Sequence, residues 1–162
     1  MYFLKHLKFL LTATNQHGVH SPFVYAFVTK CLYTKTKYSP KKSTNTLLKM
    51  LAYSKSTSIQ FTENNSELTA LILKNFPKIQ LEDSSNDFLY FEELNQNTIN
   101  IIQHKITFQN NSIVFINSIY TNYDSWKKLI QLDKIKVSVD TFYCGILFFR
   151  REQVKEHFKI RI

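Results

Sequence analysis

Apolar positions in the first 55 residues recur with helical spacing. One face of the first predicted helix carries five apolar side chains, Phe3, Leu4, Leu7, Leu10 and Leu11, with Lys5 and Lys8 off that face. A serine before a proline, Ser21-Pro22, is a helix-start signal, and helical spacing continues to residue 32. A third helix is predicted from about residue 44 to residue 53. We expect all three apolar faces to pack inward.

From residue 57 onward, short apolar runs alternate with helical patterns. The runs at 57–61, 78–81, 88–91 and 112–116 predict strands, and the stretches at 66–76, 98–105 and 123–132 predict helices. The run at 88–91 is continuously apolar, which is typical of an inner parallel strand that is covered on both faces. This alternation predicts βαβ units and a parallel sheet.

The end of the chain breaks the alternation. Residues 136–140 and 145–150 read as strands, but the gap between them is too short for a crossover helix, so they predict an antiparallel hairpin at the edge of the sheet. The predicted fold class is α/β, with a mostly parallel sheet, an antiparallel C-terminal hairpin and N-terminal helices. Residues 1–55 form a basic helical cap on residues 56–162, and the two parts make one compact unit.

Positive charge is concentrated in the first third of the chain. The formal net charge is +9, and the first 55 residues contain no Asp or Glu but nine lysines: Lys5, Lys8, Lys30, Lys35, Lys37, Lys41, Lys42, Lys49 and Lys55. Such asymmetry attracts nucleic acid or an anionic membrane through weak, non-specific forces. A solvated lysine-rich surface without a partner explains it as well. Neutralising Lys35, Lys37, Lys41 and Lys42 together separates the two interpretations.

The few cysteines and glycines bear on the expected cellular location and on the kinds of binding site that the chain can form. Cys31 and Cys144 lie far apart in apolar stretches, which predicts buried, reduced thiols rather than a disulfide or metal framework. No apolar run reaches the length of a transmembrane helix, so a cytoplasmic location is expected. The chain has only two glycines, which leaves little material for a glycine-rich phosphate loop.

Both ends of the chain resemble a known family. Residues 17–24 (HGVHSPFV), 137–153 (VSVDTFYCGILFFRREQ) and 156–161 (EHFKIR) are similar to the two ends of bacterial class I S-adenosylmethionine-dependent methyltransferases. The resemblance implies a Rossmann-like sheet, S-adenosylmethionine as cofactor and a methyl acceptor that the sequence does not identify.

The resemblance weakens at the expected cofactor turn. In the family the first strand runs into a turn of the form E-L-G-x-x-x-G, and this chain has residues 60–66 (QFTENNS) there. Thr62 and Ser66 replace the two glycines, while Asn64 and Asn65 tolerate the left-handed backbone such a turn uses. A β-branched residue at positive φ costs about 1 to 3 kcal/mol. We therefore expect close approach of the cofactor to be lost.

A carboxylate at the end of the second strand is the next element that the resemblance implies. Glu82 lies twenty positions beyond Thr62, the spacing at which dinucleotide folds hold the ribose hydroxyls. Glu82 and Asp83 are equally well read as a polar turn after a strand. One strand–helix unit is missing between residues 76 and 88, and if residues 78–83 replace the family's third strand, the ribose role does not hold.

Two acidic elements that bear on substrate or metal in the family are reduced here. The first, Y-F-D-G-x-H, corresponds to residues 90–95 (YFEELN), which keep an acid at Glu92. The second, F-D-D-x-H-W, corresponds to residues 115–121 (FINSIYT), which keep neither acid. Glu92 with Asn117 supplies too few ligands for a divalent ion, so no metal site is predicted.

These observations lead to three hypotheses. The first is a methyltransferase-like domain with weak or lost cofactor binding and catalysis, its candidate cofactor residues being Thr62, Asn64, Asn65, Ser66, Glu82 and Glu92. The second is an active S-adenosylmethionine-dependent methyltransferase that uses Glu82 for the ribose. The third is a non-catalytic module that binds nucleic acid or an anionic surface through its lysine-rich third. Methyl acceptor, partner chain and oligomeric state stay open.

Overall fold

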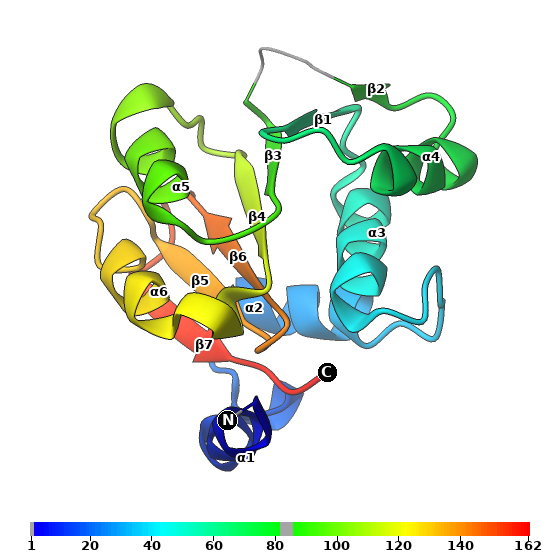
Figure 1. Ribbon diagram of the computed structural model, residues 1–162. Coiled ribbons are helices and arrows are strands. Elements are labelled where there is room, and N and C mark those ends of the chain that lie inside the picture. Colours follow the sequence, from blue (N-terminus) through cyan, green and yellow to red (C-terminus); the bar gives the residue numbers. More distant parts are fainter. Residues whose placement is uncertain (1, 82–85) are drawn as a thin grey trace.

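A computed structural model describes residues 2–81 and 86–162. Seven strands form one sheet in the order β2-β1-β3-β4-β6-β5-β7 (Figure 1). The strands are β1 (Ser58–Phe61), β2 (Gln80–Leu81), β3 (Phe88–Phe91), β4 (Ile113–Asn117), β5 (Val137–Asp140), β6 (Cys144–Phe148) and β7 (Glu156–Lys159). Strand β6 pairs antiparallel with β4 and β5, and the other pairings are parallel. The expectation of a mostly parallel sheet with an antiparallel C-terminal section is confirmed.

The hairpin is not at the edge of the sheet, contrary to the sequence-based expectation. Strand β7 lies beyond β5 and pairs with it in parallel, from Val137 opposite Glu156 to Asp140 opposite Lys159. Charged and polar side chains dominate β7 because it is an edge strand that is only partly covered. This composition hid the strand from a search for apolar runs.

Helices cover both faces of the sheet. The N-terminal elements are α1 (Tyr2–Thr12), η1 (Gln16–Gly18), α2 (Pro22–Phe27), the π-helical turn η2 (Val28–Leu32) and α3 (Lys42–Ser54). The later ones are α4 (Ser66–Asn75), α5 (Gln96–Asn100), the π-helical turn η3 (Ile101–Lys105), η4 (Ile119–Asn122) and α6 (Tyr123–Leu129). The expected start of α2 is confirmed, because the Ser21 hydroxyl accepts the Val24 N–H at 3.4 Å and Pro22 opens the helix.

The core has one layer on each face of the sheet, because alternate side chains of each strand point to opposite faces. Tyr90 packs with α2, α3 and α4 in one layer, and Phe91 packs with α5 and α6 in the other. In β6 the same alternation brings Gly145 against Trp126, where a β-carbon would lie 2.5 Å from the indole ring. A glycine is therefore required at this position for packing.

The first helix forms as predicted, but the prediction of which face is buried is wrong. Its predicted inner face is open to solvent, with exposed fractions of 71% for Phe3, 68% for Leu4 and 80% for Leu11. The buried residue of α1 is Phe9, whose ring lies 5.5 Å from that of Phe142 at the tip of the β5–β6 hairpin. The helix thus attaches through its narrower aromatic side.

None of the helices in the described ranges combines the length and apolar character needed to cross a membrane.

Candidate functional site

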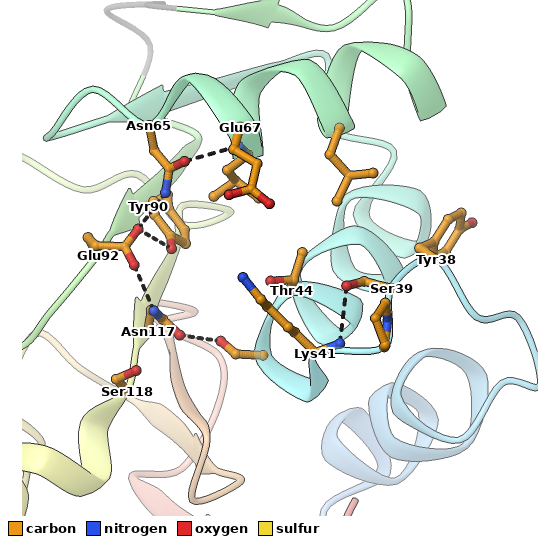
Figure 2. Close-up of a pocket in the computed structure, with 14 residues that line it drawn as sticks. Tyr38, Ser39, Lys41, Thr44, Asn65, Glu67, Tyr90, Glu92, Asn117 and Ser118 are labelled. Atoms are coloured by element: carbon orange, nitrogen blue, oxygen red, sulfur yellow. Dashed lines mark hydrogen bonds between the residues drawn. The ribbon is translucent and has the colours of Figure 1, made fainter.

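A hollow opens at the carboxyl ends of β1, β3 and β4. Its volume is about 460 Å³, and its walls come from the start of α3, from α4 and from the strand ends (Figure 2). The chain passes from β1 to β2 on one side and then to β3 on the other, so the strand order reverses here. Open α/β sheets bind ligands at such a reversal, outside the carboxyl ends of the strands. The volume lies within the range of small-molecule sites.

The carboxylate of Glu92 is the centre of a hydrogen-bond network on the floor of this hollow. One oxygen accepts from the Asn65 side-chain amide at 2.9 Å and from the Tyr90 hydroxyl at 2.8 Å. The other accepts from the Asn117 amide at 2.9 Å, and the Asn117 oxygen accepts from the Ser43 hydroxyl at 2.5 Å. These contacts join the ends of β3 and β4 and the N-cap of α4 to α3 (Figure 2). We call these five residues the Glu92 network.

The network points hydrogen-bond donors at Glu92, which is unfavourable for metal binding because a cation needs oxygen ligands there. Asn117 directs its amide nitrogen at the carboxylate and its oxygen at Ser43, so the two residues do not aim two oxygens at one point. A divalent cation needs several such oxygens to converge. Within residues 2–81 and 86–162, no group of three or more His, Cys, Asp or Glu side chains is arranged to hold a metal ion.

The turn after β1 forms without a positive φ angle, so Thr62 is free of the strain that such a backbone would impose. Among the described residues, positive φ angles occur at Lys55, Asn86, Ser118 and Phe142, and none lies within 62–66. The backbone N–H and the hydroxyl of Thr62 approach the Tyr90 carbonyl oxygen at 3.3 and 3.4 Å and tie the turn to β3. Thr62 avoids a positive φ because the chain follows another path through the turn, and the loss of close cofactor approach stays a prediction.

Asn65 has two structural roles at the end of this turn. Its side-chain oxygen caps α4 by accepting the Leu68 N–H at 3.0 Å, while its nitrogen donates to Glu92. Ser66 is the first residue of α4 and is exposed. Of the predicted cofactor residues, the structure therefore links Asn65 directly with Glu92 and brings Thr62 beside β3.

A second, smaller hollow of about 290 Å³ lies between the ends of β1 and β2. It is lined by the turn residues, including Thr62, Asn64 and Asn65, together with Leu81 of β2. Space for a ligand therefore exists beside the turn, on both sides of Asn65. The ribose candidate Glu82, and Asp83 beside it, fall outside the described residues.

The electrostatics of the site favour a neutral Tyr90. Burial, followed by the hydrogen bond to Glu92, raises the pKa of its hydroxyl well above the usual range. Tyr90 therefore stays protonated and serves as a donor to the carboxylate. Lys41, the N-cap residue of α3, and Glu67 of α4 extend into the hollow, as Figure 2 shows.

Asp140 ends β5 at the same edge of the sheet as Asn117, but it belongs to a turn and does not line this hollow. Its carboxylate accepts the Phe142 N–H at 2.8 Å and the hydroxyl of Tyr123. Burial raises the pKa of Asp140 to about 7, although the Phe142 N–H and Lys159 oppose the rise. The backbone of Phe142 is left-handed, with φ of 72°. These contacts give Asp140 a turn-forming role.

Lys41 and Ser43 were missed as site residues. They belong to the segment interpreted as a cap, and Ser43 meets Asn117 across 74 positions of the chain. Helical periodicity predicts where α3 lies but not which polar residue of its first turn reaches a strand end. Only the proline before them, Pro40, marks this turn in the sequence.

Neither a protein-family model, nor a curated protein, nor a solved structure matches the chain. The likeness to methyltransferases therefore rests on the residues quoted above.

Proposed function

We propose that this protein is a methyltransferase-like, Rossmann-like α/β domain in which S-adenosylmethionine binding and catalysis of methyl transfer are weak or lost. The observation that carries the proposal is the Glu92 network. A carboxylate at the end of the third strand is satisfied by three side-chain donors of the protein itself. A ligand that binds this carboxylate must displace at least one of these donors, and losing a hydrogen bond to a charged group has a cost.

The sheet supports the methyltransferase-like part of the proposal. Parallel strands followed by an antiparallel hairpin are the arrangement that the family resemblance implies, and β6 lies antiparallel between β4 and β5. Only six positions separate β2 from β3, too few for a crossover helix. This shortening agrees with the missing strand–helix unit inferred from the sequence.

The turn supports the loss of the cofactor. Asn65 bridges α4 and Glu92 within the turn that, in the family, brings the bare backbone of two glycines to the cofactor. A ligand that needs this backbone must first break a bond to a carboxylate, and hydrogen bonds to charged groups contribute about 1.5 to 3 kcal/mol. The intact network therefore opposes binding at this edge.

Calorimetric titration with S-adenosylmethionine tests the proposal. We expect no binding in the micromolar range for the natural protein, and detectable binding for Asn65→Gly, which removes the donor to Glu92. Asn64→Gly is the matched control, because it makes the same change at the exposed neighbouring position, and it should behave like the natural protein. Micromolar binding by the natural protein contradicts the proposal. If neither variant binds S-adenosylmethionine, the Glu92 network is not the cause of the lost binding.

An active methyltransferase is the second candidate, because one specific observation favours it. Two hollows, of about 460 and 290 Å³, flank Asn65 and leave room for a nucleoside beside the turn. In this case Glu82 binds the ribose, and Glu82→Ala abolishes a micromolar affinity for S-adenosylmethionine that the natural protein must show. The buried thiols of Cys31 and Cys144 fit a cytoplasmic setting under either candidate.

A further inference from the structure

Helix α1 exposes a continuous apolar surface. Six of the nine large hydrophobic side chains that are exposed in the described residues belong to this one helix: Tyr2, Phe3, Leu4, Leu7, Leu10 and Leu11. At 100° per residue, the last five of them cover an arc of about 120° that points away from the sheet. Exposed apolar patches of this kind mark interaction sites rather than ordinary surface.

Lysines border this surface along one edge. Lys5 and Lys8 follow the apolar arc on α1, and beside them is a hollow of about 210 Å³ that Lys127 of α6 and Lys159 of β7 also line. The lining of this hollow contains no acidic side chain. We call these four residues the α1 lysine cluster. The cluster brings lysines of α1 together with lysines of α6 and β7. It is a different group from the lysines at residues 35–42 that the sequence suggested.

Contacts of the protein hold the cluster in place while leaving most of its charge unpaired. Lys5 donates to the Tyr120 carbonyl oxygen at 3.3 Å, and Lys159 donates to the Thr12 hydroxyl at 3.2 Å. Lys127 has an exposed ion pair with Asp124 at 3.4 Å. No ion pair engages the other three lysines within the part of the chain that the structure describes.

Other lysines among residues 1–55 already donate hydrogen bonds within the protein. Lys49 donates to the carbonyl oxygens of Leu32 and Thr34, at 2.9 and 2.7 Å, where η2 ends. Lys42 donates to the Ile162 carbonyl oxygen at 2.6 Å. The concentration of lysines in the sequence is therefore a poor guide to where free positive charge gathers. The α1 lysine cluster is the group that adjoins exposed apolar surface.

We propose that α1 docks on the surface of an anionic lipid bilayer, with its apolar arc among the upper acyl chains and the α1 lysine cluster at the headgroup phosphates. An amphipathic helix with lysines beside its apolar face is suited to lie in the plane of such an interface. The cluster hollow has room for a phosphate group. Because α1 is already folded against Phe142, docking does not have to pay for helix formation.

Charge and shape exclude the other occupants. A second copy of a chain with net charge +9 would bring two α1 lysine clusters together, and like charges repel. Nucleic acid matches the lysines but gains little from Leu7, Leu10 and Leu11, because aliphatic side chains do not stack on bases as aromatic ones do. The arc belongs to a single helix, whose side chains form a convex ridge, so it is poorly shaped to take up a peptide in a groove.

Vesicle co-sedimentation of the full chain tests the proposal. We expect the protein to sediment with phosphatidylcholine vesicles that contain phosphatidylglycerol, and to bind pure phosphatidylcholine at least about tenfold more weakly. Leu11→Glu should lower binding to the anionic vesicles by about tenfold or more. Val154→Glu is the matched control. It introduces the same charge at a residue of similar exposure, since Val154 is 76% exposed and Leu11 is 80% exposed.

A second pair of variants tests the contribution of the lysine charges to vesicle binding. Changing Lys8 and Lys127 together to Gln should weaken anionic vesicle binding several-fold, whereas Lys74 and Lys78, exposed at the α4 side of the molecule, should tolerate the same double change (Figure 1). Circular dichroism checks that each variant is folded.

Three results with vesicles or in measurements of oligomeric state overturn the proposal, and a fourth would come from nucleic-acid binding. These are failure to sediment with the anionic vesicles, equal binding by Leu11→Glu and Val154→Glu, and conversion of a dimer to a monomer by Leu11→Glu. Nucleic-acid binding that matches the vesicle affinity and ignores Leu11→Glu also contradicts it.

Discussion

Two regions of the molecule are stabilised in opposite ways. The β5–β6 hairpin is surrounded by fully buried groups, including Phe142, Trp126 and the closely packed Gly145. The carboxyl edge of β1, β3 and β4 is open and is held by the Glu92 network. The family resemblance is longest in the first region and weakest in the second. A packed scaffold constrains its residues tightly, whereas a polar edge can exchange one hydrogen-bonded set for another.

The largest effect is expected at Gly145. Gly145→Ala places a methyl group 2.5 Å from the Trp126 ring, so the buried indole must move. Overpacking of this kind should lower the free energy of unfolding by about 3 kcal/mol, measured by urea denaturation. Trp126→Phe removes the ring atoms in the way, and the double variant should be more stable than the sum of the single effects predicts. Strict additivity contradicts this account of the packing.

Asp140 should give the hairpin region a distinctive pH dependence. In the unfolded chain its carboxyl ionises near pH 4, whereas burial in the fold raises its pKa to about 7. Between these values unfolding releases a proton, so the stabilisation present at low pH is lost as the pH rises toward 7. Asp140→Asn removes this penalty. Relative to the natural protein, the variant should gain about 2 kcal/mol between pH 5 and pH 8.

The measurement is the difference in unfolding free energy between the two proteins at each pH, which cancels most contributions from other groups. His157 lies in the same region, and burial lowers its pKa. Its contribution has the opposite sign, because folded stability is lost as the pH falls, and it is common to both proteins. A difference that stays constant with pH contradicts the buried, protonated Asp140.

The smallest effect is expected at the open edge. Glu92→Gln puts an amide nitrogen where a donor now points, which should lower the unfolding free energy by about 1 kcal/mol. Glu93→Gln makes the same change at the exposed neighbour, whose carboxylate accepts a hydrogen bond from Asn95 alone among the described residues, and should have almost no effect. Equal effects at both positions in chemical denaturation would show that the Glu92 network contributes nothing.

Regular elements were predictable because their signals are local. The apolar run at 88–91 is continuous because β3 is buried on both faces, and Ser21-Pro22 caps α2 as expected. Strand β7 was missed because its partly covered residues alternate without a clear apolar face. The face of α1 was assigned wrongly, because periodicity shows that a helix is amphipathic but not what covers its apolar side.

The candidate site was predictable only in part. Family spacing brought attention to Asn65 and Glu92, which do form a hydrogen bond. It gave no sign that Tyr90 and Ser43 complete the network, since these contacts depend on how β3 and α3 are placed in space. Glu82 lies outside the described residues, so its ribose role stays a prediction.

The location of any cofactor contact tests the central claim most directly. Side-chain amide signals of Asn65 and Asn117 in a nuclear magnetic resonance spectrum can be followed during titration with S-adenosylmethionine. The account predicts that both signals keep their positions up to about 100 micromolar cofactor, because Glu92 retains both amides as donors. Saturable shifts of these two signals in that range would contradict it and would favour an active methyltransferase.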